Sequence, residues 1–298
     1  MALPLEGIRV LDIATILAGP YGATLLGDMG ADVIKIEPPA GDESRTMSPG
    51  LANESGLFIG VNRNKRGIVL DLTKPDGRDV YYRLVKTADV VVENMRADAE
   101  QRLGVSYEHT VQHNPRIIYI SVSTFGESGP YAGRPGIDPL AQALTGFMST
   151  TGLPGGGPLR TSVAIGDATC ANLVAYAAMV GLWARERQGI GQRIELSLID
   201  GLIHVQPREV GQYSVGQGHP RPAVQQQVVP QPLPGHGPAG PRGRRALHEQ
   251  HEAPAPLRGA GSRDSQVVCL GHVEGGDEGA DRRRRHRRAG QRPGRGLA

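Results

Sequence analysis

Short apolar runs alternate with helix-like segments along the first 122 residues, and this alternation constrains the fold more than any other feature of the chain. Runs rich in Val, Ile and Leu predict strands over residues 8–13, 32–37, 68–72, 90–93 and 117–122. The intervening segments predict helices over residues 21–29, 76–86, 97–103 and 107–112. Strands separated by helices favour parallel pairing, so we expect an α/β fold with a doubly wound, mostly parallel sheet. In such sheets ligands bind beyond the carboxyl ends of the strands.

The following hundred residues continue in the same style. A helix is predicted over residues 138–147, before a Gly- and Pro-rich loop over 152–158. A long apolar helix is predicted over 168–187, a short strand over 193–196 and a further helix through Val205.

The last 78 residues differ from the rest in both charge and composition. Of the 33 basic residues of the chain, 14 lie between Arg221 and Ala298, against 7 of its 30 acidic ones, so this tail has a net charge of +7 and residues 1–220 a net charge of −4. After Tyr213 there is no Phe, Tyr, Trp, Met, Ile, Lys, Asn or Thr, whereas Gly, Ala, Arg and Pro supply 45 of the 78 residues. Such a segment buries too little apolar surface to fold, and we expect a disordered low-complexity tail over residues 223–298.

Two origins of the tail remain open. An out-of-frame translation of GC-rich DNA would give this composition. A natural disordered tail would give it too, and the arginines of 282–288 could then bind phosphates in a nucleic acid. The net charge of +3 for the whole chain averages two unlike parts, so it is not evidence for a nucleic-acid partner.

The N-terminus and the cysteines indicate the compartment. The first residues lack the basic start and apolar stretch of a signal peptide, and no unbroken apolar run reaches the ~18–20 residues that cross a bilayer. The two cysteines, Cys170 and Cys269, form neither a disulfide framework nor a zinc motif. We therefore expect a cytoplasmic protein without a membrane partner and without a bound metal.

Two motifs in the first half suggest an anionic ligand, and each also has a purely structural interpretation. The turn around Gly19-Pro20 lacks the G-x-G-x-x-G spacing of dinucleotide-binding proteins, but it is suited to a helix start, whose free N–H groups can bind an anion. The cations of 62–67 are either a solvated charge run or a clamp for the phosphates of a nucleotide-containing ligand.

Asp167 precedes the long apolar helix and is the main candidate for chemistry. Locally it fits an N-cap, whose carboxylate would accept the first free helix N–H groups. The same position suits an oxygen nucleophile, with Gly166 leaving room for a substrate. No Ser-His-Asp, H-E-x-x-H or C-x-x-C pattern competes with it.

Taken together, these segments resemble the class III coenzyme A transferases, a family that includes formyl-CoA transferase, carnitine CoA-transferases and α-methylacyl-CoA racemase. The resemblance runs from about Leu3 to Pro222 and implies that residues 1–222 are the Rossmann-like large domain of the family, incomplete because members continue in folded sequence beyond this point. The matching residues are Leu5–Asp12, Ala18–Pro20, Gly30–Glu37, Asn64–Arg66, Ala88–Asn94, Gln142-Ala143, Gly166-Asp167 and Gln188–Gln192.

The resemblance implies an activity. Asp167 would attack the thioester of an acyl-CoA donor, and coenzyme A would pass through aspartyl anhydride and aspartyl-CoA thioester intermediates to a small carboxylic acid. The matching positions imply coenzyme A contacts at Leu17, Ala18, Leu70, Asp71, Leu72, Thr73, Asn94, Met95, Arg96 and Arg102, with Arg134 as a substitute for a lysine that falls at Pro135. The family also implies an interlocked homodimer.

Two alternatives to the transferase remain. The racemases of the family use a histidine where this chain has Ile137, and isoleucine cannot exchange a proton, so the transferase is favoured within the family. A non-catalytic protein that binds coenzyme A, or binds nucleic acid through the Arg-rich tail, is the alternative from another class.

Overall fold

One parallel sheet forms the centre of the protein. The computed structural model describes residues 2–48, 55–153 and 155–216. Six strands pair in the order β3-β2-β1-β4-β5-β6, and every neighbouring pair is parallel. The strands are β1 (Arg9–Asp12), β2 (Asp32–Glu37), β3 (Lys65–Val69), β4 (Val90–Glu93), β5 (Ile118–Ser123) and β6 (Gln192–Ser197). The predicted doubly wound α/β fold is confirmed, whereas the predicted tail and its boundary at residue 222 lie outside the described residues.

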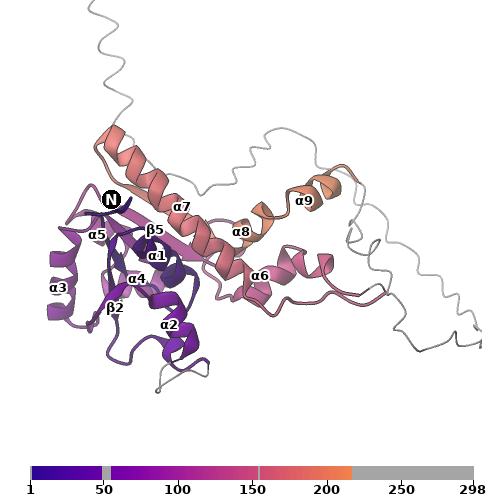
Figure 1. The fold of residues 1–298 in the computed structure, drawn as a ribbon, viewed down its shortest axis with the longest axis horizontal. Coiled ribbons are helices and arrows are strands. Elements are labelled where there is room, and N and C mark those ends of the chain that lie inside the picture. The colour runs from indigo at the N-terminus through magenta and orange to yellow at the C-terminus, as the bar shows by residue number, and fades with distance from the viewer. Residues whose placement is uncertain (1, 49–54, 154, 217–298) are drawn as a thin grey trace, which may run out of the picture.

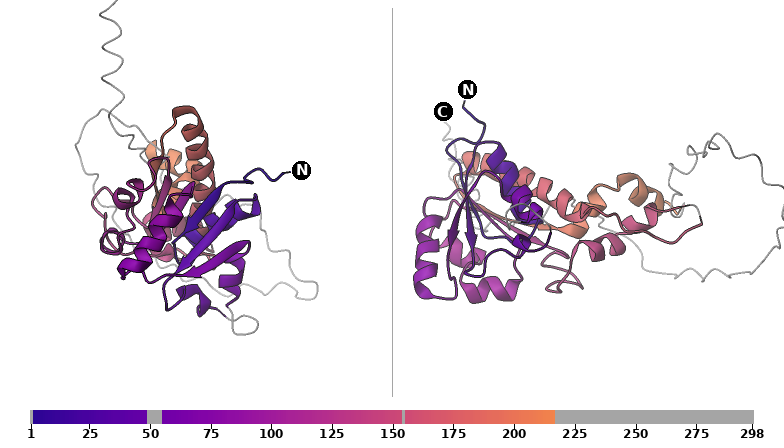
Figure 2. Two further views of the ribbon diagram at one scale, coloured as in Figure 1. Left: turned by 90° about the vertical axis from the view of Figure 1, so that its left-hand side faces the viewer. Right: turned by 60° about the horizontal axis from the view of Figure 1, so that its bottom comes forward.

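Helices cover both faces of the sheet (Figure 1). Along the chain they are α1 (Ala18–Asp28), α2 (Gly56–Asn62), α3 (Pro75–Val85), α4 (Ala97–Leu103), α5 (Tyr107–Val111), α6 (Asp138–Leu144), α7 (Ile165–Gln188), α8 (Leu198–His204) and α9 (Pro207–Ser214), with 3-10 turns at η1 (Glu43–Arg45) and η2 (Phe147–Thr150). Figure 2 shows α1 and α7 on one face of the sheet and α3, α4 and α5 on the other. Helices α6, α8 and α9 extend from the N-terminal end of α7, away from α3 (Figure 1).

Alternation along the strands produces two apolar cores. Val10 and Val90 face α1 and α7, whereas the next residues, Leu11 and Val91, face α3 and α5. All four side chains are fully buried. Near-continuous apolar strands are therefore what a sheet covered on both faces requires.

Helix α7 is a core helix with one exposed apolar stripe. It packs on α1, β5 and α8, and Cys170 and Val174 are completely buried there. In the described part of the chain it is the one helix long and apolar enough to cross a membrane by length and composition, although 44% of its most apolar window is buried within the fold. Its buried side chains belong to the apolar core beside α1 and α8.

Several element boundaries differ from the sequence prediction. The strand predicted over 68–72 spans Lys65–Val69, because its register is set by pairing with Val33–Glu37 of β2. The helix predicted to reach Phe147 ends at Leu144, where Gly146 turns into the left-handed region at φ 73°. Helix α1 begins at Ala18 rather than Tyr21, and α2 and α9 were not predicted at all.

Candidate active site

The loops after β1 and β4 meet at the carboxyl edge of the sheet, where the strand order reverses between β1 and β4. The Asn94 amide joins them: its Oδ1 accepts the backbone N–H of Thr15 at 2.8 Å, and its Nδ2 donates to the Thr15 carbonyl at 2.8 Å. On the other side Asp42 accepts the N–H of Ile16 at 3.2 Å. Ile16 has φ 70°, a left-handed conformation that is costly for a β-branched residue. The strained turn is thus held from both flanks.

A buried network of two lysines and two aspartates lies beneath this turn. Lys65 Nζ contacts Asp12 at 2.7 Å, and Lys35 Nζ contacts Asp42 at 2.8 Å and Asp12 at 3.6 Å. At most 3% of each of these four side chains is exposed. Positive and negative charges are matched, which is the condition for burying them.

The structure places the cations at 62–67 against acidic side chains of the protein itself. Lys65 is enclosed by its own fold, Arg63 pairs with Asp28, and Arg66 pairs with Asp32 at 2.7 Å. These pairs favour a structural charge run. The side chains of Arg63 and Arg66 are nevertheless 44% and 66% exposed, so the phosphate clamp stays a prediction.

Asp167 lines a pocket of about 220 Å³ at the N-terminal end of α7. The walls come from the β1 loop, the start of α6, and the segment that enters α7. The lining residues are Ile16, Leu17, Ile137, Asp138, Pro139, Arg160, Thr161, Ser162, Val163, Ala164 and Asp167. The pocket therefore joins the predicted nucleophile to Leu17, one of the predicted coenzyme A contacts.

The start of α7 is capped by an aspartate from another helix. Asp138 Oδ1 accepts the backbone N–H of Gly166 at 2.6 Å and that of Asp167 at 3.3 Å. A Cβ at position 166 would lie 2.8 Å from this Asp138 oxygen, so glycine makes room for the capping carboxylate. Gln142 Nε2 in turn donates to Asp138 Oδ2 at 2.5 Å.

This arrangement corrects the interpretation of Asp167 as an N-cap. The N-cap position is Ala164, and Asp167 is the third residue of the helix, with no side-chain capping bond. Its carboxylate is partly buried, and burial together with the neighbouring Asp138 charge raises its pKa from the usual 3.8 to about 7. A carboxylate that is freed from capping and is poorly solvated is suited to act as a nucleophile.

The predicted coenzyme A contacts all follow the carboxyl ends of strands. The structure brings only some of them close to one another. Leu70, Leu72 and Met95 pack against the same apolar core, and Ala18 begins α1 beside Leu17. Asp71 and Thr73 bond to each other, with the Thr73 N–H donating to Asp71 Oδ1 at 3.0 Å.

The three predicted arginines stand apart from this group. Arg96 and Arg102 are more than 60% exposed and contact Asp98 at 3.2 and 3.9 Å. Arg134 lies over the Tyr131 ring, 4.8 Å from its centroid. Their roles as phosphate partners stay predictions.

Sequence reasoning missed two polar members of the site. Gln142 was noted as part of a motif without a role, yet it is fully buried and its Oε1 accepts the Thr161 N–H at 3.1 Å. Arg160 was not noticed, because a single arginine after a Gly- and Pro-rich loop has no distinguishing local signal. Among the described residues no group of three or more His, Cys, Asp or Glu side chains is placed to hold a metal ion.

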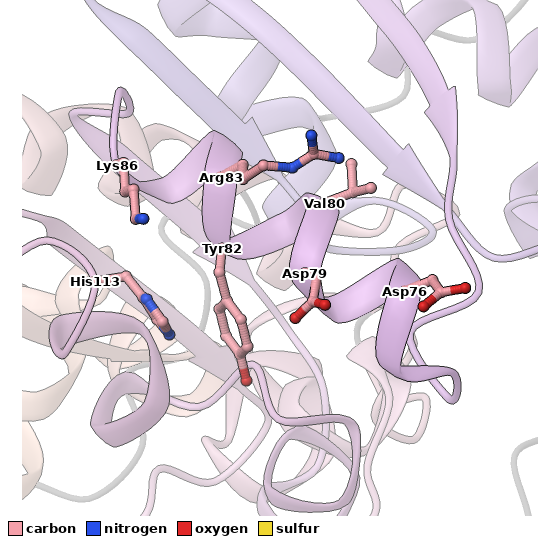
Figure 3. A pocket seen from close by; sticks show the side chains of 7 residues that line it. All are labelled: Asp76, Asp79, Val80, Tyr82, Arg83, Lys86 and His113. Carbon is pink, nitrogen blue, oxygen red and sulfur yellow. The ribbon is translucent and has the colours of Figure 1, made fainter.

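A larger hollow of about 600 Å³ lies elsewhere, along α3 (Figure 3). Tyr82 and Asp79 point to one side of the helix, and the His113 ring stacks on Tyr82 with centroids 4.0 Å apart. Since none of the predicted functional residues lines this hollow, the pocket of Asp167 is the better candidate despite its smaller volume.

The comparison to known protein families agrees with the fold. The chain belongs to CoA-transferase family III, whose model matches residues 5–234. This match covers the whole sheet, the pocket and Asp167.

Curated and structural relatives support the assignment. The chain is 42% identical over 205 residues to a succinate–glutarate CoA-transferase of Agrobacterium fabrum, an alignment that covers 66% of this chain and 51% of that protein. It is 41% identical over 202 residues to an acetyl-CoA:oxalate CoA-transferase of Acetobacter aceti, covering 67% of this chain and 52% of the relative. A CAIB/BAIF family protein from Brucella suis superposes with a TM-score of 0.71 at 37% identity, covering 74% of this chain and 60% of that one. The chain thus spans about half the length of the curated relatives it matches.

Proposed function

We propose that this protein transfers coenzyme A from an acyl-CoA donor to a small carboxylic acid, with Asp167 as the nucleophile. The observation that carries the proposal is the position of Asp167: partly buried, free of capping bonds, and facing a pocket that it shares with Leu17. Relatives at about 40% identity are named as transferases that use succinyl-CoA or acetyl-CoA and small acids, which supports the substrate class.

The chemistry follows from the two properties that the site gives Asp167. Its carboxylate oxygen attacks the thioester carbonyl carbon, the C–S bond breaks, and coenzyme A leaves as the thiolate. The thiolate then attacks the Asp167 carbonyl of the mixed anhydride, releasing the donor acid and leaving an aspartyl-CoA thioester. The acceptor carboxylate reverses these two steps, so the new acyl-CoA forms and Asp167 returns to a carboxylate.

Ile137 supports the transferase over the racemase. It lines the pocket of Asp167 at the position where racemases of the family have a histidine, and it is 67% exposed. The isoleucine side chain cannot exchange a proton. The proton acceptors that this pocket offers are Asp167 and the neighbouring Asp138, without the histidine that the racemases of the family use at position 137.

The proposal also includes where coenzyme A lies on the protein, where the protein is located and how it assembles. Coenzyme A would lie along the carboxyl edge of the sheet, over the loops after β1, β3 and β4, and reach Asp167 past Leu17. We also propose a homodimer, because the exposed apolar stripe of α7, from Tyr176 to Trp183, offers surface for a partner. A cytoplasmic location completes the proposal.

A trapping experiment tests the proposed nucleophile. The chain is incubated with succinyl-CoA or acetyl-CoA, quenched with hydroxylamine and digested, and the modified peptide is located by mass spectrometry. We expect the hydroxamate on Asp167 and none in Asp167→Asn. Asp76→Asn is the matched control, because Asp76 also lies in the first turn of a helix but outside this pocket. A hydroxamate on another residue, or none with either donor, would contradict the proposal.

A further inference from the structure

The pocket of Asp167 contains one basic side chain. Two acids, Asp138 and Asp167, line it, and the rest of its wall is apolar or small except for Arg160. In the proposed sequence the acceptor acid enters when Asp167 is already a neutral coenzyme A thioester, but the negative charge of Asp138 remains beside it and repels the incoming carboxylate. Arg160 is the group that can offset this repulsion.

The protein does not use the Arg160 guanidinium for itself. Within the part of the chain that the structure describes, no hydrogen bond or ion pair joins it to an acidic side chain, whereas Arg185 pairs with Asp89 and Arg193 with Glu127. The raised pKa of Asp167 also indicates that Arg160 is not paired with it. Burial and Asp138 account for its raised pKa, and no neighbouring cation opposes them. The guanidinium is therefore left for a ligand.

The backbone on either side of Arg160 is anchored. The Leu159 N–H donates to the Met148 carbonyl at 3.1 Å, and the Thr161 N–H donates to Gln142 Oε1 at 3.1 Å. Gln142 also holds Asp138, so one buried amide connects the Arg160 segment to the cap of α7. An exposed arginine on a fixed backbone, a few residues before Asp167, has the construction of a recognition residue.

We infer that Arg160 binds a second carboxylate of the acceptor, so that the pocket selects short dicarboxylic acids. The inference rests on the proposed function. One carboxylate must reach Asp167 to react, and the guanidinium can hold the other in a bidentate pair. The pocket, with a volume of about 220 Å³, has room for a short acid. Ile16, Leu17 and Val163 provide apolar wall for the methylene groups between the two carboxylates.

Calorimetric titration of the chain with two matched acids tests this inference. Glutarate and pentanoate have the same five-carbon chain and differ by one carboxylate. We expect glutarate to bind the unaltered protein more tightly, Arg160→Gln to weaken glutarate about 10- to 100-fold, and Arg160→Lys to retain part of the affinity because it keeps the charge but not the fork. Pentanoate should bind the unaltered protein and Arg160→Gln equally.

The control is Arg208→Gln, which removes an exposed arginine on α9 that does not line the pocket. It should leave both affinities unchanged. The inference is overturned if glutarate does not bind, if Arg160→Gln leaves glutarate affinity intact, or if both acids weaken equally.

The trapping experiment separates this inference from the proposed function, since it needs only the acyl-CoA donor. Hydroxamate on Asp167 together with a glutarate affinity that ignores Arg160 refutes the dicarboxylate site alone. Arg160-dependent glutarate binding without hydroxamate on Asp167 refutes the nucleophile alone.

Discussion

Two regions of this protein bury aspartates, and they do so in opposite ways. Beneath the β1 loop, Asp12 and Asp42 are each in contact with a lysine ammonium group at 2.7–2.8 Å. In the pocket, Asp167 has Asp138 as its charged neighbour and no cation among the causes of its pKa shift. The two regions lie at the same edge of the sheet, so their difference does not come from the layer of the fold in which they sit.

The difference teaches how to tell a structural charge from a reactive one. A matched network lowers the energy of the ionised state and fixes the backbone around it, as it fixes Ile16 through Asp42. Two acids without a neighbouring cation raise the free energy of the ionised state. Their carboxylates are less stabilised by the protein and are therefore more reactive. Between these two regions, charge balance rather than burial alone distinguishes the structural network from the candidate site.

The largest expected effect is the loss of chemistry in Asp167→Asn. Without a carboxylate oxygen no anhydride forms, so the rate at which the new acyl-CoA appears from donor and acceptor acid should fall by on the order of 10³-fold or more. The new acyl-CoA is separated from the donor by chromatography and quantified. Asp76→Asn should keep the rate of the unaltered protein, and a rate retained by Asp167→Asn would remove Asp167 from the reactive class.

The difference in stability between the unaltered protein and Asp167→Asn should depend on pH. The pKa of Asp167 is raised from 3.8 to about 7 in the folded protein, so the folded state keeps a proton that the unfolded state loses between these values. Stability therefore falls as pH rises through this window. Asp167→Asn lacks the ionisable group and should be more stable than the unaltered protein above pH 7 and equally stable below about pH 4, as urea unfolding would show.

For the matched network we expect the opposite effect on stability: removal of one charged side chain should destabilise the protein. Lys65→Met leaves Asp12 buried with one distant cation, Lys35 at 3.6 Å, and should cost about 3–5 kcal/mol of unfolding free energy. Urea unfolding measures it. Adding Asp12→Asn should restore part of the loss, because the orphaned charge disappears. Lys86→Met, on the exposed side of α3, is the control, and an equal cost there would deny the network its role.

Asp138→Asn sharpens the account of the unmatched pair. The amide oxygen can still accept the Gly166 N–H, while the negative charge beside Asp167 is removed. The pKa of Asp167 should therefore fall below its value of about 7, by less than the full shift because burial, the larger cause, remains. The pH profile of new acyl-CoA formation, which rises as Asp167 ionises, should reach its plateau at lower pH. An unmoved profile would show that Asp138 acts only as a cap.

How much of this could be predicted from the sequence depends on the range of the interactions. Strand and helix order follows from local periodicity, so the sheet and the position of Asp167 near the start of α7 were predictable. The cap of α7 comes from Asp138, 29 residues away from Asp167, and no local pattern records it. The same holds for Lys65, whose partner Asp12 is 53 residues distant and which looked like a surface cation. Resemblance to a family predicted Asp167 as the nucleophile, whereas Arg160 is recognised only in the folded pocket, as the one basic side chain among its described lining residues.

The smallest expected effect concerns the exposed cations beside Lys65. Arg66 pairs with Asp32, and its side chain is 66% exposed, so Arg66→Ala should change the unfolding free energy by about 0.2–1 kcal/mol. Because its charge is already matched by Asp32, the apparent affinity for acyl-CoA, measured by new acyl-CoA formation over a range of donor concentrations, should stay the same. A rise of tenfold or more in the donor concentration required would return the run at 62–67 to the phosphate-binding class. Placed next to Lys65→Met, this variant shows that two adjacent cations of one strand differ in their contribution because one is enclosed with its partner and the other is in water.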